Sequence, residues 1–205
     1  MQVNFIFAII VLIMSVVIHE VSHGYVANIL GDPTARLSGR LTLNPLKHLD
    51  FFGSFIVPAF TYLLGGFIFG WAKPVPYNPY NLKNQKWCPA LVGVAGPFSN
   101  ILVALFFGLL IRLNFGFFIL PSAFIGIASL VVFINLVLAI FNLVPIPPLD
   151  GSKVLFALIP YRYSHIQTKI EQYGFFILLF FIFFFFQAIF PLVSSLFHLI
   201  TGFSM

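Results

Sequence analysis

Five long apolar stretches, separated by shorter polar connections, dominate the pattern along the chain. They cover residues 4–30, 51–70, 90–113, 117–143 and 174–200. A helix of about 20 apolar residues is long enough to cross the hydrocarbon core of a bilayer. The pattern therefore predicts an all-α polytopic membrane protein with about four to five transmembrane helices.

The apolar segment 51–70 differs from the others, because Pro58 lies inside it and Gly65 and Gly66 lie near its end. If this segment crosses the membrane, the Lys and Arg residues divide almost evenly between the two sides. If it enters and returns on the same side, all of them but Arg112 fall on one side. The positive-inside rule favours a re-entrant segment, with the N-terminus outside and the basic loops in the cytosol.

The polar connections contain turn and loop signals. Residues 31–50 combine Gly and Pro with alternating Leu and Thr, which predicts short β-strands or a hairpin. Residues 70–89 contain four prolines and are predicted to form an extended loop. Residues 144–173 begin with a proline-rich stretch and continue as a polar, amphipathic segment.

We expect one membrane-embedded domain over residues 1–205. Its core motifs lie in 15–153, and the amphipathic segment and the last helix follow in 154–205. The Phe-rich stretch 174–200 carries no charged residue and is expected to face lipid or to pack against other helices.

The composition agrees with a membrane location. The chain is 60% hydrophobic and only 7% charged, whereas soluble domains carry about 25% charged residues. The net charge of +5 is therefore attributed to loop orientation, and no nucleic-acid partner is expected. Cys88 is the single cysteine, so no internal disulfide can form.

The first apolar stretch contains the motif His-Glu-Val-Ser-His. His19 and His23 are four residues apart, so on a helix they lie on one face, where both can bind one metal ion. Glu20 can reach a water molecule at that metal, as in the H-E-x-x-H motif of zinc hydrolases. The alternative is a set of buried polar residues that pair with other helices. A metal is the better explanation, since each ionisable side chain in a span costs roughly 2.5–3.5 kcal/mol.

A catalytic zinc ion usually has three protein ligands. The metzincin continuation is excluded, because Val26 and Ile29 replace its Gly and His. Asp150 is favoured as the third ligand, because three prolines open the helix before it and can bring a carboxylate to membrane depth. The other candidates are Asp32, His48, Asp50, Cys88, His165, Glu171 and His198.

The segments "HEVSHG", "AGPFSN" and "NLVPIPPLDG" together resemble the site-2 protease family of intramembrane zinc metalloproteases, peptidase family M50. "LNPLKHLD" and "GWAKPVPYNP" are similar to a compact prokaryotic branch of that family that lacks a PDZ domain. The resemblance extends over residues 15–153 and follows the family's order of motifs.

The resemblance implies a site with one Zn²⁺ per chain. His19, His23 and Asp150 would bind the zinc, and Glu20 would be the catalytic base. Asn142 would lie beside the catalytic centre, where its amide could donate to the oxyanion or bind the substrate backbone. The alternative for Asn142 is a hydrogen bond that supports helix packing.

The resemblance also bears on three other segments. Asn100 would lie on the helix that packs against the first span, where a structural role is expected. His48 matches the branch pattern, but we expect it to be a loop histidine. The stretch "GWAKPVP" would form an edge strand to which an extended substrate could add.

The function implied is hydrolysis of peptide bonds within or near transmembrane segments of membrane proteins. The active site would lie toward the cytosolic side of the cell membrane. The alternative is a non-proteolytic membrane protein that binds or transports metal, which would have no need for Glu20 as a base. Few polar residues in 90–113 and 174–200 argue against a transport path. A regulatory membrane partner and the oligomeric state stay open.

Overall fold

The computed structural model describes residues 5–50, 73–113 and 120–203, with the isolated positions Gly53, Ile56, Phe60 and Leu63. Its long helices are α1 (Phe5–Ile29), α4 (Cys88–Leu113), α5 (Ser122–Asn142), α7 (Ser164–Phe185) and α8 (Ile189–Thr201). The described residues contain four helical segments that are long and apolar enough to cross a membrane. The prediction of a mostly helical polytopic membrane protein is confirmed at this level. The predicted re-entrant segment 51–70 lies outside the described residues, apart from those four positions.

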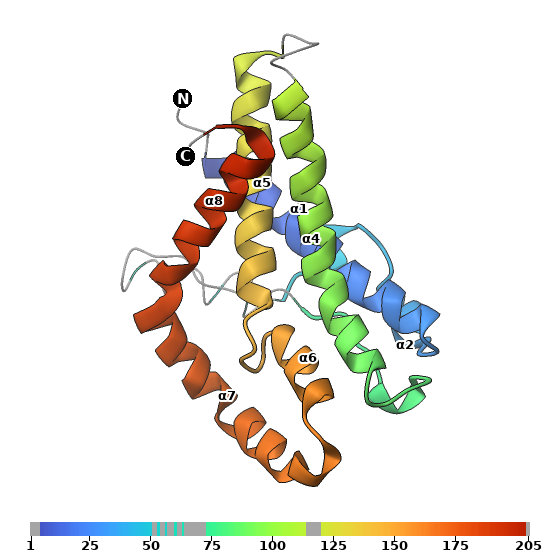
Figure 1. Ribbon diagram of the computed structural model, residues 1–205. Coiled ribbons are helices and arrows are strands. Elements are labelled where there is room, and N and C mark those ends of the chain that lie inside the picture. The colour runs from blue at the N-terminus through green and yellow to red at the C-terminus, as the bar shows by residue number, and fades with distance from the viewer. Residues whose placement is uncertain are drawn as a thin grey trace.

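Helices α1, α4 and α5 pack side by side and carry the polar residues of the site (Figure 1). Small residues on α4 allow its neighbours to come close. Beside Gly93 lies the backbone of Asp150, and beside Gly96 lie the imidazoles of two histidines of α1. The close approach of these backbones brings residues from distant parts of the chain into one site.

The connection between α1 and α4 begins and ends at the same end of the molecule. Its first and last parts, residues 30–32 and 78–83, are joined by hydrogen bonds, and we call this pair of segments the neck. The N–H of Lys83 donates to the carbonyl of Leu30 over 3.0 Å. Asp32 is fully buried, and its carboxylate accepts from the Asn78 N–H over 2.6 Å and from the Asn81 side-chain amide over 2.8 Å. The neck therefore fixes the end of α1 against the start of α4.

The predicted hairpin in 31–50 is wrong. This segment contains the short helix α2 (Thr34–Leu37) and the 3-10 helix η1 (Pro45–Lys47), and none of the described residues lies in a β-strand. Asp32 accepts a hydrogen bond from the N–H of Thr34, and Asn44 accepts one from the N–H of Leu46. Side chains thus satisfy the local backbone and favour helical turns over a strand ladder.

The predicted loop in 70–89 agrees with the structure over residues 73–87, whereas Cys88 and Pro89 already belong to α4. Residues 73–78 form neither helix nor strand, and the 3-10 helix η3 (Pro79–Asn81) follows them. The predicted edge strand "GWAKPVP" is not seen in its described part, residues 73–76. Residues 70–72 lie outside the described part of the chain.

The last helix predicted for 174–200 is part of a longer helical run over Tyr161–Thr201. It comprises the 3-10 helix η4 (Tyr161–Tyr163), α7, the 3-10 helix η5 (Phe186–Ala188) and α8. The run bends at η5, so that α8 packs against α5 while α7 extends away from the other helices (Figure 1). Exposed Phe176, Phe183 and Phe184 on α7 agree with the prediction of a lipid-facing surface.

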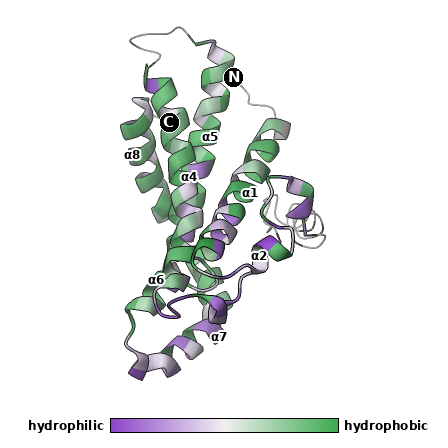
Figure 2. Ribbon diagram, turned by 90° about the vertical axis from the view of Figure 1, so that its right-hand side faces the viewer, coloured by the Kyte–Doolittle hydropathy of each residue, from purple (hydrophilic) through white to green (hydrophobic). Residues whose placement is uncertain are grey.

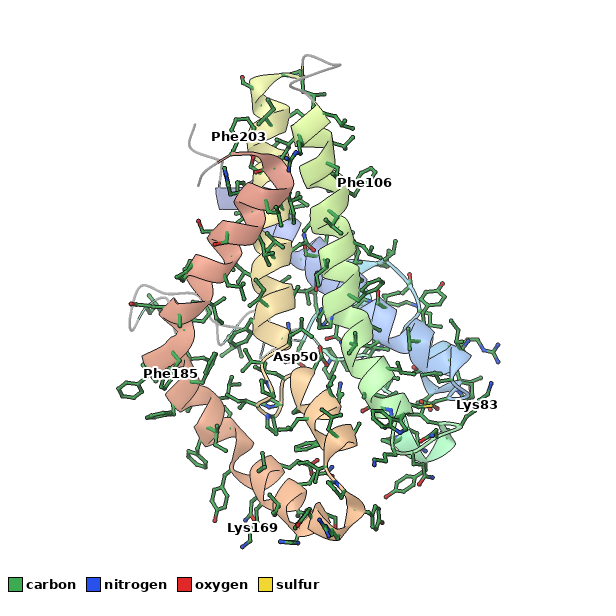
Figure 3. The ribbon with its side chains drawn as sticks, viewed as in Figure 1. Asp50, Lys83, Phe106, Lys169, Phe185 and Phe203 are labelled. Atoms are coloured by element: carbon green, nitrogen blue, oxygen red, sulfur yellow. The ribbon has the colours of Figure 1, made fainter. Side chains whose placement is uncertain are left out.

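The two ends of the helix bundle differ in polarity. Hydrophilic residues gather around α2, the loops and the start of α7, whereas α5 and α8 are largely hydrophobic (Figure 2). Lys83 and Lys169 lie toward this polar end, and Phe106 and Phe203 lie toward the other (Figure 3). The carboxyl ends of α1 and α5 both reach the polar end, so residues near them lie at similar depth.

Candidate metal centre

Helix α1 presents His19 and His23 on one face, one turn apart. Their ring centroids are 4.6 Å apart, and both residues are buried. The helix is continuous through the motif, because the residues around it are apolar and contain no proline. The face predicted from the spacing of the two histidines is therefore formed.

Asp150 completes the group from the far end of the chain, at the N-terminal end of helix α6 (Gly151–Leu158). One carboxylate oxygen, Oδ2, lies 3.0 Å from Nε2 of His19 and 3.1 Å from Nε2 of His23. The ligand atoms of the three residues all lie within 4.8 Å of one another. Within the part of the chain that the structure describes, this is the group of His, Cys, Asp and Glu side chains able to hold a metal.

The remaining candidates for the third ligand lie elsewhere among the described residues. Asp32 accepts a hydrogen bond from the N–H of Asn78 in the neck. Nε2 of His48 lies 2.8 Å from the carbonyl oxygen of Thr42. His48 is buried, and its Nδ1 has no hydrogen-bond partner within the described ranges. Cys88 is a buried free thiol at the start of α4. The candidates outside the metal group are Asp32, His48, Asp50, Cys88, His165, Glu171 and His198.

The three residues fit a zinc ion. Tetrahedral ligands about 2.0–2.1 Å from zinc are separated by roughly 3.3 Å, close to the observed distances from Oδ2 of Asp150 to the two histidines. Nδ1 of His19 lies 2.6 Å from Oδ1 of Asn100, and Nδ1 of His23 lies 2.6 Å from the carbonyl of Val92. Both Nδ1 atoms donate to these oxygens, which leaves the Nε2 lone pairs for a metal.

The space beside the two Nε2 atoms depends on Gly96 of α4. A Cβ at this position would lie 2.5 Å from Nε2 of His19 and would also overlap Nε2 of His23. Real Cβ atoms do not approach other heavy atoms so closely. The absence of a side chain at Gly96 therefore keeps the histidine rings where they meet Asp150.

Lys153 supports Asp150 from the next turn of α6. Its Nζ lies 2.9 Å from Oδ1 of Asp150 and 5.4 Å from the centre of the Tyr77 ring. Burial alone would lower the pKa of Lys153, but the adjacent charge of Asp150 raises it above its ordinary value. Lys153 thus stays charged and fixes one oxygen of Asp150, while the other oxygen faces the histidines.

Glu20, the predicted base, is partly buried and is held by the loop before η3. Its Oε2 accepts a hydrogen bond from the N–H of Val75 over 2.8 Å. Glu20 directly follows His19 on α1, so it lies in the same helical turn as the two histidines. The loop that the sequence predicted to bind substrate therefore orients the carboxylate of Glu20.

Asn142, the other predicted catalytic residue, lies in the last turn of α5. Its amide donates to the carbonyl of Leu138 over 2.9 Å, within its own helix. In the described residues it has no hydrogen bond to the metal group or to Glu20. A role toward substrate stays a prediction for Asn142.

Several residues of the site fall outside the sequence-based predictions. The sequence predicted neither the contact of Asn100 with His19 nor the ion pair of Lys153 with Asp150. An available signal is the amide side chain in the middle of two otherwise apolar helices, at Asn100 and Asn135. Polar groups inside a span are costly and commonly functional.

Proteins that carry the name of a zinc metalloprotease are similar to this chain in sequence. The family model for peptidase family M50 matches residues 118–185. A Bacillus subtilis protein, "Putative zinc metalloprotease YwhC", is 39% identical over 196 residues, which cover 92% of this chain and 86% of the relative. The chain belongs to peptidase family M50.

More distant relatives of this M50 protein occur in mycobacteria. "Putative zinc metalloprotease Rip2" of Mycolicibacterium smegmatis is 32% identical over 80% of this chain and 62% of the relative. Rip2 of Mycobacterium tuberculosis is 30% identical over 70% of this chain and 53% of the relative. No solved structure matches the chain.

Proposed function

We propose that this M50 protein is an intramembrane zinc metalloprotease that cleaves peptide bonds within or near transmembrane segments of other membrane proteins. The proposal rests on one observation: the ligand atoms of His19, His23 and Asp150 lie within 4.8 Å of one another. Glu20 lies on α1, the helix that carries both histidines. Membership of a peptidase family and four apolar helices support a protease that works in a lipid environment.

One zinc ion per chain would be held by Nε2 of His19, Nε2 of His23 and Oδ2 of Asp150. Bound there, zinc supplies Lewis-acid activation of water and of the scissile carbonyl. Glu20 accepts a proton from the attacking water and passes it to the nitrogen of the leaving amine. Lys153 keeps Asp150 oriented toward the histidines.

The substrate must be locally unwound before it is cleaved, because a transmembrane helix keeps its peptide groups in internal hydrogen bonds. The loop formed by residues 73–78 lies beside the base, through the bond from Val75 to Glu20. This loop is a suitable surface for holding an extended substrate near Glu20. The amide of Asn142 would need to leave Leu138 to contact the substrate.

The active site would lie toward the cytosolic side of the cell membrane. Of the ten Lys and Arg residues, nine lie either in the connection between α1 and α4 or between the start of α6 and the first two turns of α7, and Arg112 lies in the last turn of α4. Positive charge of this kind is retained in the cytosol. Arg112, at the far end of α4, donates to the carbonyl of Leu199.

The decisive experiment is cleavage of a model transmembrane substrate by the purified full-length chain in detergent, with bound zinc quantified. Wild type is compared with Glu20→Gln and Asp150→Asn. We expect wild-type cleavage to be lost in both variants, with zinc retained in Glu20→Gln and reduced in Asp150→Asn. Glu171→Gln is the matched acid-to-amide control, because Glu171 is exposed on α7 and lies outside the metal group, so cleavage should be unchanged.

Two results would contradict the proposal. Full cleavage by Glu20→Gln would exclude Glu20 as the base. Zinc binding without cleavage of any tested substrate, unaltered by Glu20→Gln, would indicate a protein that binds metal and does not hydrolyse peptides.

A further inference from the structure

Asn100 connects the metal group to the middle of the bundle. It lies on α4, is fully buried, and its Oδ1 is 2.6 Å from Nδ1 of His19. Its Nδ2 donates to Oδ1 of Asn135 over 2.8 Å and to the backbone carbonyl of Ser15 over 3.3 Å. Asn100 therefore touches α1 at two points and α5 at a third.

Asn135 continues the hydrogen-bond chain on α5 and is also fully buried. Its Nδ2 donates to Oγ of Ser15 over 2.9 Å and to the carbonyl of Val131 over 2.9 Å. Three apolar helices are thus joined by a chain of hydrogen bonds that ends on a metal-ligand candidate, His19. Buried amides of this kind are costly unless every polar atom is bonded.

The direction of this chain is fixed by backbone carbonyls, which can only accept. The carbonyl of Val131 requires the NH₂ group of Asn135 on its side, so Oδ1 of Asn135 faces Asn100 and must accept. The carbonyl of Ser15 and Oδ1 of Asn135 together use both protons of the Asn100 amide. Oδ1 of Asn100 is then an acceptor that faces His19, and Nδ1 of His19 has to carry a proton.

We propose that Asn100 and Asn135 are positioning residues that fix the ring proton of His19 on Nδ1 and thereby reserve its Nε2 for the metal. The inference rests on the proposed function, because the metal is the zinc of the protease site. His23 needs no such device, since the backbone carbonyl of Val92 accepts from its Nδ1. The two ligands therefore depend on different partners, and they can be separated by mutation.

The first test measures zinc affinity of the full chain in detergent by competition with a chelator. Asn100→Leu removes the acceptor at nearly constant volume, and we expect zinc to bind about 10–100-fold more weakly. Asn100→Asp keeps an acceptor for His19 but loses both donated bonds, so zinc affinity is expected to stay near wild type while thermal stability falls. Ser99→Ala is the matched control, because Ser99 is adjacent on α4 and its hydroxyl donates to the Gly96 carbonyl of its own helix.

The second test follows the ring protons of His19 and His23 by ¹⁵N NMR of the same proteins, with and without zinc. In wild type, Nδ1 of both histidines is expected to be protonated. In Asn100→Leu, the proton of His19 is expected to leave Nδ1, while that of His23 is unchanged. Asn135→Leu, which frees the Asn100 amide to rotate, should give a smaller shift of the same kind, and it provides a second route if Asn100→Leu does not fold.

The results separate this inference from the proposed function. Wild type without zinc affinity would contradict the protease proposal, yet the position of the His19 proton would still decide the role of Asn100. The inference is overturned if Asn100→Leu binds zinc as wild type does, or if Asn100→Asp is as impaired as Asn100→Leu. An equal loss in Ser99→Ala would also overturn it, since the effect would then come from general disturbance of α4.

Discussion

Gly96→Ala is the substitution that most directly tests the packing of α4 against the histidines. The added Cβ would lie 2.5 Å from Nε2 and 2.6 Å from Cε1 of His19, whereas carbon atoms pack at about 3.5–4.0 Å. The ring has to move by about 1 Å, because the Cβ is fixed to the helix backbone. A misplacement of this size typically costs about 10²-fold in rate, and we expect zinc affinity to fall by at least about 10-fold.

The assay compares zinc affinity, cleavage rate and thermal stability of Gly96→Ala with those of Gly126→Ala. Gly126 lies in α5 with no heavy atom within 4 Å of the Cβ position among the described residues. Alanine is a better helix former than glycine, so Gly126→Ala should leave zinc binding intact and raise stability by up to about 1 kcal/mol. Wild-type zinc affinity in Gly96→Ala would refute the packing of α4 on the ligand atoms.

Three further changes test other parts of the structure, with thermal unfolding followed by a thiol-reactive dye at the buried Cys88. Burial alone would raise the pKa of Asp32, but hydrogen bonds from Thr34 and Asn81 hold it below its usual value. The ionised carboxylate of Asp32 should therefore stabilise the native state above about pH 4, and this stabilisation should be lost as the pH falls further. We expect Asp32→Asn to destabilise the protein by about 1–3 kcal/mol at neutral pH and by less in acid. An equal effect at every pH would contradict this. Gly151→Ala should unfold at a lower temperature than wild type, because its Cβ would overlap the backbone of Leu143, and unchanged unfolding would argue against that contact. Removal of zinc by a chelator should lower the unfolding temperature, since zinc at about a thousandfold excess over Kd stabilises the native state by about 4 kcal/mol; an unfolding temperature that is insensitive to metal would exclude a native-state zinc site.

The parts of the site that depend on local sequence could be predicted. The pairing of His19 with His23 follows from helix periodicity alone, and the helix is set by an apolar run without proline. Asp150 could be inferred because the carboxylate stands next to prolines at the end of an apolar stretch. The bundle itself followed from segment length, which is a strong signal in membrane proteins.

Two kinds of contact could not be predicted from the sequence. One is the contact between residues far apart in the chain, and the other is the hydrogen bond from a backbone N–H to a nearby side chain. Alternating Leu and Thr predict a hairpin, but Asp32 and Asn44 bond to nearby N–H groups and stabilise short helices instead. The contact of Asn100 with His19 spans 81 positions of sequence. The apolar sequence around Asn100 marks its amide as unusual, but no local pattern identifies His19 as its partner.

The neck between α1 and α4 has a consequence for how sequences of this kind can change in length. Leu30 and Lys83 are joined by backbone atoms alone, so this closure tolerates most side-chain replacements. Asp32 adds bonds to both Asn78 and Asn81. Insertions or deletions between Asp32 and Asn78 therefore need not change where α1 ends or where α4 begins. We expect homologous chains to gain or lose residues between Asp32 and Asn78, while His19, His23 and Asp150 keep their positions in space.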